Sequence, residues 1–247
     1  MNMDSRKILT EQIEYYRARA PEYDEWHLRQ GRYDRGEAHR QVWVAELDAV
    51  RSALRNANPS GRVLELSCGT GLWTGRLAEN AEKLVAVDAS PEAIEINRAG
   101  NGHPHVRYVV ADIFDWRPEE SFDFIFFGFW LSHVPPELFD QFWRMVRSVL
   151  KPGGRVFFVD SLMTPDSTAK DHAQIDGSGT LERKLNNGSV FRIVKIFYES
   201  RELERRLRSG GWNATVSVTG RFFLYGSIGT NQPGGNLSRA MWDVCVR

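Results

Sequence analysis

The sequence predicts an α/β protein built on a doubly wound, mostly parallel β-sheet. Between residues 62 and 161, short apolar runs alternate with segments of helical spacing, which is the pattern of repeated β-α units. One run, SFDFIFFGF at 121–129, is apolar on both faces, as a central parallel strand should be. Two further runs, at 212–220 and 221–229, predict a closing antiparallel strand pair.

Composition narrows the class of function. The 247 residues carry 32 basic and 32 acidic side chains, and this balance argues against a nucleic-acid partner, which needs clustered positive charge. Cys68 and Cys245 are too few for a disulfide framework or a thiolate zinc cluster, so we expect a reducing, cytoplasmic setting and no metal site. The charged N-terminus and the lack of a long apolar window argue against a signal peptide and a membrane span.

We expect one domain over 1–247, beginning with N-terminal helices at 1–57, of which the segment 5–30 is expected to act as a mobile lid. Residues 5–20 have near-helical apolar spacing, and Pro21 ends that helix and opens a short second one at 21–28. A glycine- and arginine-rich loop follows. A stronger helix is predicted at 38–57 because four apolar residues share one stripe: Trp43, Leu47, Val50 and Leu54.

The next segment, 58–160, is the predicted cofactor-binding core. Its strands are expected at 62–67, 83–89, 105–112, 121–129 and 155–161. Its helices are expected at 71–81, after Ser90, and at 135–150. Ser90-Pro91-Glu92 is a strong helix start, with a capping residue, a proline at the first helical position and an early acid.

The remainder divides into a substrate-side insert at 161–198 and a C-terminal part at 199–247. Polar residues at 164–179 predict a loop, and 180–197 predicts an inserted β-hairpin around an Asn-Gly turn. Ser200 is expected to cap a helix that Gly210 ends, before the closing strands. The tail from residue 230 carries little pattern.

The segment Glu65-Leu-Ser-Cys-Gly-Thr-Gly71, at the end of the first strand, holds the chemistry. Glycines there let the backbone turn sharply and approach a ligand. A dinucleotide fold would place a third glycine at position 74, where this chain has Thr74, and no Gly-Lys-Ser/Thr phosphate loop exists. An acid beside glycines suits a cationic ammonium better than a pyrophosphate.

Here the sequence resembles the class I S-adenosylmethionine-dependent methyltransferases, which have a Rossmann-like fold. Five motifs in the order and spacing of that family carry the resemblance: VLELSCGTG (63–71), VAVDAS (85–90), VVADIFDW (109–116), FDFIFFGFWLSHVP (122–135) and LKPGGRVFFVD (150–160). Within the family, YYRARAPEYD (15–24), GFWLSHVP (128–135) and NGSVFRIVKIF (187–197) look like the phosphonate O-methyltransferases of the dehydrophos type. The resemblance implies S-adenosylmethionine as cofactor and a small-molecule acceptor from natural product biosynthesis.

The resemblance also implies roles for individual residues. Asp88 would accept hydrogen bonds from both ribose hydroxyls, since a carboxylate offers two acceptor oxygens. Asp112 and the backbone of Ile113 would read the adenine, with Phe114 over the ring. The other cofactor contacts expected are Tyr23, Glu65, Gly69, Thr70, Gly71, Trp73, Thr74, Ala89, Ser90, Phe127 and Gly128.

Aromatic side chains are candidates to surround the positive sulfur of the cofactor, since cations are attracted to aromatic faces. Tyr15, Tyr16, Tyr23, Trp73 and Trp130 are the candidates, each with plain core packing as the alternative, and Tyr16 and Trp130 are also expected at the substrate.

Charged groups define the expected substrate side of the site. Arg19 could reach the cofactor carboxylate or an anionic substrate. His133 is a candidate general base, with structural packing as the alternative, because histidine titrates near neutral pH.

The hairpin supplies the remaining basic residues: Arg183, Lys184, Arg192 and Lys195. Arg183, Arg192 and Lys195 are expected to bind a phosphonate or carboxylate, for which arginine is suited by its planar pair of donors. Their spacing carries a warning, because Arg192 and Lys195 point to opposite faces of a regular strand. A solvated hairpin face is the alternative.

We therefore expect methyl transfer to an oxygen of an anionic small molecule, by a monomer or homodimer. Two alternatives stay open: methylation of an amine, hydroxyl or phenol with His133 as base, and a non-catalytic cofactor-binding partner subunit. An amino-group methyltransferase of nucleic acid or glutamine would show an Asn/Asp-Pro-Pro-aromatic motif where this chain has Phe127-Gly-Phe-Trp130.

Overall fold

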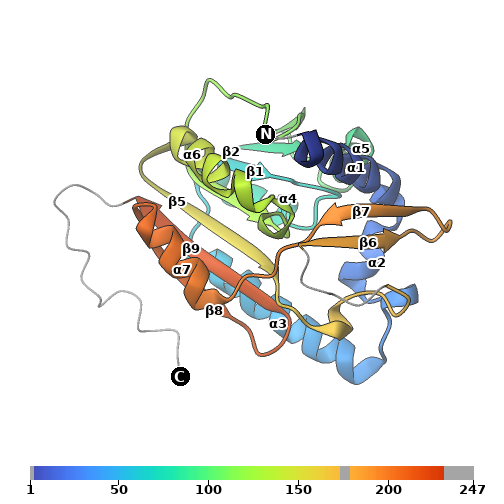
Figure 1. Cartoon of the computed structure of the whole chain (residues 1–247). Helices are drawn as coiled ribbons and strands as arrows, with labels where there is room; N and C mark the ends of the chain where they lie inside the picture. The colour runs from blue at the N-terminus through green and yellow to red at the C-terminus, as the bar shows by residue number, and fades with distance from the viewer. Residues whose placement is uncertain (1–2, 173–178, 231–247) are drawn as a thin grey trace.

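The computed structural model describes residues 3–172 and 179–230. Its centre is a seven-stranded sheet in the order β3-β2-β1-β4-β5-β9-β8 (Figure 1). The first five strands of that order are parallel: Val106–Val110 (β3), Ala81–Asp88 (β2), Gly61–Leu66 (β1), Phe122–Gly128 (β4) and Leu150–Ser161 (β5). Phe223–Thr230 (β9) and Trp212–Val218 (β8) close the sheet antiparallel, as predicted.

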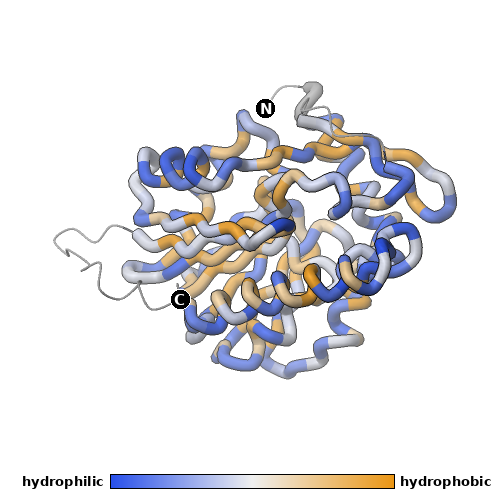
Figure 2. Tube along the Cα trace, turned by 90° about the horizontal axis from the view of Figure 1, so that it is seen from below, coloured by the Kyte–Doolittle hydropathy of each residue, from blue (hydrophilic) through white to orange (hydrophobic). Residues whose placement is uncertain are grey.

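Both faces of the sheet are covered, which explains why its central strands are apolar throughout (Figure 2). Along β4, Phe124 and Phe126 enter one buried cluster, while Ile125 and Phe127 enter the other. The first cluster is completed by Glu37–Asn56 (α3) and Thr74–Ala78 (α4). The second is completed by Phe139–Val149 (α6) and Ser200–Ser209 (α7), on the opposite side from α3 (Figure 1).

The remaining helices are Pro91–Gly100 (α5), which packs against β2 and β3, and the N-terminal helices, which cover the carboxyl edge of the sheet. Helix α5 follows β2 and starts as predicted, because the Ser90 hydroxyl accepts a hydrogen bond from the amide of Ala93. Met3–Arg19 (α1) continues through the single turn Ala20–Glu22 (η1) into Tyr23–Leu28 (α2). Gly31–Tyr33 (η2) then leads to α3.

The inserted hairpin is present as Thr180–Lys184 (β6) paired with Val190–Val194 (β7). It packs against α1 rather than joining the main sheet (Figure 1). The buried amide of Gln12 fixes the contact, since its oxygen accepts from the amide of Val194 and its nitrogen donates to the carbonyl of His133. Helix α1, the hairpin and the turn Leu131–His133 (η3) are therefore joined at one point.

Three local expectations are corrected. The helix predicted at 71–81 is only Thr74–Ala78, because the glycine loop extends to residue 73 and β2 already begins at Ala81. The predicted cap of α7, Ser200, is its first helical residue, and the Glu199 carboxylate caps the helix by accepting from the amide of Glu202. Strand β5 begins at Leu150, earlier than predicted. The tail 231–247 lies outside the described residues.

Candidate active site

A cavity lies at the carboxyl ends of β1, β2 and β4, where parallel sheets of this type bind ligands. It encloses about 810 Å³, part of it open to solvent, and α1 covers it. Its lining includes thirteen residues that the sequence predicted for the site: Tyr16, Tyr23, Gly69, Thr70, Asp88, Ala89, Ser90, Asp112, Ile113, Phe114, Gly128, Trp130 and His133. We call this cavity the first cavity.

Asp88 is held rigidly at the end of β2. One carboxylate oxygen accepts from the amide of Gly69 at 2.8 Å, and the other accepts from the amide of Ser90 at 2.9 Å. Burial raises the pKa of Asp88, while these backbone donors oppose that shift. Asp112 is fixed in the same way, because it accepts from the amide of Phe114 at 2.9 Å. Both carboxylates keep free lone pairs beside the cavity.

Five predicted cofactor residues lie outside this lining: Glu65, Gly71, Trp73, Thr74 and Phe127. Phe127 belongs to the core, where its ring stacks on that of Phe158. The indole of Trp73 packs on Phe126 and fills the space beside Gly128, where an added Cβ would stand 2.9 Å from its nitrogen.

The Glu65 carboxyl takes part in a buried network under the glycine loop. Thr74 donates to it at 2.7 Å, and Asn97 donates to Thr74 at 2.8 Å. Burial raises the pKa of Glu65 to about 8. Gly71 has φ +95°, and an added Cβ there would lie 2.4 Å from Asn97. The network therefore requires glycine at this position and fixes the path of the loop.

The sequence missed one wall of the first cavity. Leu9, Gln12 and Ile13 line it from α1 and Ala20 lines it from η1, together with Ser67, Ala93 and Phe129 from other segments. The helical spacing of Leu9, Ile13 and Tyr16 predicted a buried apolar stripe. Spacing alone does not distinguish a stripe that packs on the protein core from one that lines a cavity.

A second cavity of about 590 Å³ adjoins the first, and the two share Tyr16, Tyr23, Phe129 and His133 in their linings. Three cationic side chains face the second cavity: Arg19, Arg183 and Lys195. Its wall is otherwise aromatic and hydroxyl-bearing, from Trp26, Tyr33, Phe197, Ser161, Ser167 and Thr168, with His172 and Ile193.

Among the described residues, positive charges outnumber negative charges around the second cavity. Lys195 lies 3.5 Å from the buried carboxylate of Asp160 and donates to the hydroxyl of Ser132 at 2.7 Å. Arg183 and Arg19, each 8% exposed, have no carboxylate partner among the residues that the structure describes. Arg19 instead lies 4.7 Å from the ring of Tyr23 and donates to the Tyr33 hydroxyl. Burial lowers the pKa of both Arg183 and Lys195.

Arg192 does not join this group. Its side chain is exposed, it lies in neither cavity lining, and its backbone amide donates to Glu11. The placement of Arg192 beside the substrate is therefore wrong for this structure. The cause is the odd spacing to Lys195, which turns the two side chains to different faces of the hairpin, and Lys184 is likewise exposed.

His133 is buried and tightly partnered. Its Nδ1 lies 2.7 Å from the carbonyl oxygen of Val194, and its Nε2 lies 2.8 Å from the hydroxyl of Tyr16. Burial, together with the charge of Lys195, holds the pKa of His133 well below its usual value. The imidazole is therefore neutral, Nδ1–H donates to Val194, and Nε2 accepts the Tyr16 proton.

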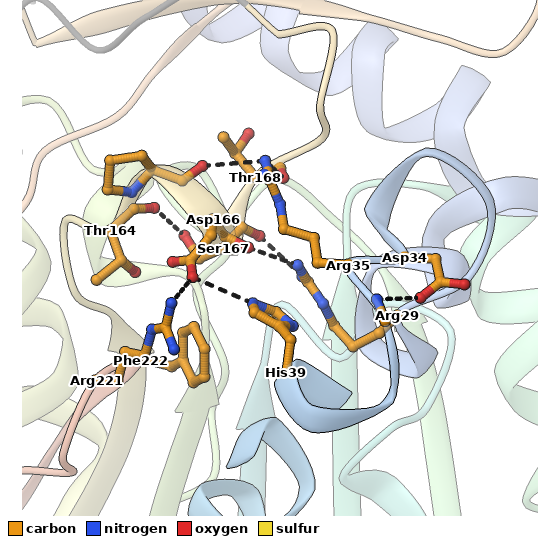
Figure 3. Close-up of polar contacts among 12 residues, drawn as sticks. Arg29, Asp34, Arg35, His39, Thr164, Asp166, Ser167, Thr168, Arg221 and Phe222 are labelled. Atoms are coloured by element: carbon orange, nitrogen blue, oxygen red, sulfur yellow. Dashed lines mark hydrogen bonds and ion pairs between the residues drawn. The ribbon is translucent and has the colours of Figure 1, made fainter. Parts of the chain in front are cut away.

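The loop after β5 supplies Ser167 and Thr168 to the second cavity, and Arg29 holds that loop (Figure 3). Arg29 is 1% exposed, and it donates to the carbonyls of Asp166 at 2.7 Å and Ser167 at 2.9 Å. The Asp166 carboxylate pairs with Arg221 and lies 3.5 Å from a ring nitrogen of His39. These contacts join the segment after α2 to one wall of the cavity.

Residues 3–172 and 179–230 contain no group of three His, Cys, Asp or Glu side chains that could hold a metal ion. The same residues contain no helix long and apolar enough to cross a membrane.

Comparisons with known proteins place the chain in a family. A family model described as "Methyltransferase domain" matches residues 63–154. Two solved structures, DhpI with SAH and DhpI with SAM and HEP, are 35% identical to this chain, with TM-scores of 0.75 and 0.74. Each alignment covers 90% of this chain and 97% of the DhpI chain.

Curated relatives match over a shorter length. A ubiquinone biosynthesis O-methyltransferase of Xanthomonas campestris pv. campestris is 32% identical over 161 residues, and the alignment covers 64% of each protein. Nodulation protein S of Rhizobium tropici is 32% identical over 104 residues, covering 40% of this chain and 43% of that protein. The five strands, the glycine loop and the DhpI match together confirm the predicted resemblance: the chain belongs to the class I S-adenosylmethionine-dependent methyltransferases.

Proposed function

We propose that this protein transfers the methyl group of S-adenosylmethionine to an oxygen of a small anionic acceptor, such as a phosphonate or a carboxylate. The observation that carries the proposal is the buried positive charge of the second cavity, which among the described residues only the Asp160 carboxylate offsets in part, directly beside the cavity that fits the cofactor. The cofactor supplies an electrophilic methyl group on a positively charged sulfur.

The first cavity has the groups that this cofactor needs. Asp88 offers free acceptor lone pairs for two ribose hydroxyls, and Asp112 offers the same for an adenine amino group beside the apolar side chains of Ile113 and Phe114. The glycine loop from Gly69 brings backbone close to the methionine part. The rings of Tyr16, Tyr23 and Trp130 give a sulfonium aromatic neighbours.

The second cavity fits an anion. Arg19, Arg183 and Lys195 bring three positive charges out of water, and Asp160 offsets one of them. Buried charge without a partner is costly, so a bound anion would relieve that cost as well as make hydrogen bonds. Each arginine can donate two parallel bonds to a phosphonate or carboxylate. Because the two cavities share four residues, an acceptor held here would lie beside the methyl group, and holding donor and acceptor in line supplies much of the catalysis.

The state of His133 favours an acceptor that is already ionised. A neutral hydroxyl or amine would have to give its proton through Tyr16 to His133, which would create an imidazolium beside Lys195, with Arg183 and Arg19 nearby. Like charges make that state unfavourable. An ionised oxygen needs no base, so His133 is left to orient the Tyr16 hydroxyl.

Exchanging arginines of the hairpin tests the proposal. Arg183→Ala should raise the KM for a phosphonate or carboxylate acceptor roughly ten- to a hundredfold, since a charge-assisted bidentate bond contributes about 1.5–3 kcal/mol. The dissociation constant for SAH should stay nearly unchanged, and Arg183→Lys should restore binding only in part.

Arg192→Ala is the matched control, because Arg192 lies on the paired strand of the same hairpin with its side chain in solvent. It should leave both constants unchanged. Equal effects of Arg183→Ala and Arg192→Ala on the acceptor KM would overturn the assignment of the anion to the second cavity.

A further inference from the structure

Two hydroxyl groups of the second cavity share one arrangement. Tyr16 Oη lies 2.8 Å from Nε2 of His133, whose Nδ1 faces the carbonyl oxygen of Val194. Thr168 Oγ1 lies 2.9 Å from Nδ1 of His172, whose Nε2 faces the carbonyl oxygen of Lys184 at 3.4 Å. In both cases a backbone carbonyl, a histidine and a hydroxyl stand in series.

The series fixes where each proton lies. A carbonyl oxygen only accepts, so the ring nitrogen that faces it must carry the hydrogen. Both histidines are neutral, because burial holds the pKa of His133 well below its usual value and lowers that of His172 to about 3, with Arg183 adding to the shift at His172. The second ring nitrogen is therefore a bare lone pair, and it takes the single proton of the hydroxyl.

A hydroxyl whose proton is committed can offer a ligand only its oxygen lone pairs. Ser167 adds a third such oxygen, since its hydroxyl donates to the carbonyl of Thr164 at 2.8 Å. The second cavity thus presents cationic donors from Arg19, Arg183 and Lys195, and accepting oxygens from Tyr16, Ser167 and Thr168. The cationic donors suit an anion, whereas the accepting oxygens suit an O–H or N–H group.

We propose that the acceptor molecule carries an O–H or N–H donor group beside its anionic oxygen, and that Thr168 selects for that group. His172 is the positioning residue that keeps the Thr168 proton turned away from the ligand. This inference rests on the proposed function. Thr168 is the better residue to substitute, because it lines only the second cavity. Tyr16 lines both cavities, so its substitution would also affect the cofactor site.

The expected discrimination follows from the cost of leaving polar groups unpaired. A site built to hydrogen-bond a ligand hydroxyl rejects the analogue that lacks it, because the oxygen in the wall loses both water and partner. A methoxy group in the same place would bind more weakly still, because its own lone pairs would face the accepting oxygen and repel it.

The test uses three acceptors that differ in one group: 2-hydroxypropylphosphonate, propylphosphonate and 2-methoxypropylphosphonate, with the corresponding carboxylates run in parallel. The unsubstituted protein should favour the hydroxyl compound over the other two by at least about tenfold in kcat/KM. Thr168→Val should reduce that preference at least about fivefold, with the dissociation constant for SAH unchanged.

His172→Phe should free the Thr168 proton and raise the relative kcat/KM of the methoxy compound, a change that a purely structural role of His172 would not produce. Thr10→Val is the control, because Thr10 is exposed on α1 and its hydroxyl donates within the helix. It should keep the preference of the unsubstituted protein.

The outcomes separate this inference from the proposed function. Equal kcat/KM for all three substituents would overturn the inference and leave anionic O-methylation intact. So would a Thr168→Val variant that slows all three compounds alike. If no phosphonate or carboxylate is methylated at all, the proposed function fails, and this inference fails with it.

Discussion

Glu65 lies under the glycine-rich loop with 1% of its surface exposed, and its pKa is raised to about 8 because burial disfavours the charged form. In the folded protein without ligand, the carboxyl therefore stays protonated in the range where an unfolded glutamate, with its usual pKa near 4.5, has ionised. The folded state binds more protons there, so this residue makes stability fall as pH rises from about 4.5 to about 8.

Replacing Glu65 by its neutral isostere should remove that dependence. The free energy of unfolding of Glu65→Gln, relative to the unsubstituted protein, should increase by up to about 1.4 kcal/mol per pH unit between pH 4.5 and 8 and then level off. Urea unfolding at several pH values measures it. Glu95→Gln, on the exposed face of α5, should show a constant difference, and a flat profile for Glu65→Gln would contradict the burial argument.

At the scale of elements, two segments far apart in sequence are joined around the second cavity. Arg29 sits at the end of α2 with its guanidinium 4.4 Å from the ring of Trp43, and it reaches across to the loop after β5. Trp26 also donates to the carbonyl of Ser167, so that carbonyl receives one bond from α2 and one from Arg29, the residue that follows α2. The position of Ser167 and Thr168 therefore depends on α2.

Arg29→Gln should leave the carbonyls of Asp166 and Ser167 without their guanidinium donors. We expect a loss of roughly 1–3 kcal/mol of stability in urea unfolding, together with a raised acceptor KM. Arg147→Gln provides the control, because Arg147 also lies over an indole, at 4.0 Å from the ring of Trp212, and donates to a carbonyl far from the site. If both variants gave the same acceptor KM, the loop would not depend on Arg29.

Helix α1 covers the first cavity and is joined to the hairpin through Gln12. We propose that α1 and α2 open to admit the cofactor and close over it, which excludes water from the reaction. Hydrogen exchange should slow in α1 and α2 when SAH binds, while α3 stays unchanged. Equal protection of α1 with and without SAH would argue against opening.

At the scale of the molecule, the sequence predicted the elements well where a local pattern decides them. The apolar run of β4, the Ser90 cap of α5 and the hairpin of β6 and β7 all follow from short-range spacing. The end of α4 did not, because the glycine loop and the start of β2 set its length. Local propensity is weak where neighbouring elements compete for the same residues.

The residues of the site also fall into those that the sequence could place and those that it could not. Residues at strand ends, such as Asp88 and Asp112, line the first cavity because strand order alone brings them to one edge. Arg183 and Arg192 differ in exposure because one face of the hairpin packs against α1. This tertiary contact could not be predicted from the sequence of the hairpin. The proton positions around His133 and His172 were equally beyond the sequence, since they depend on carbonyls more than ten residues away.

The measurement that most directly tests the central claim compares acceptors by charge. The purified protein is given S-adenosylmethionine labelled with carbon-13 in the methyl group, together with small phosphonates and carboxylates or with neutral alcohols, phenols and amines of matched size. We predict that the label appears on a phosphonate or carboxylate oxygen, with a higher kcat/KM than for any neutral compound. Faster labelling of a neutral hydroxyl or amine, abolished by His133→Ala and unaffected by Arg183→Ala, would contradict the account.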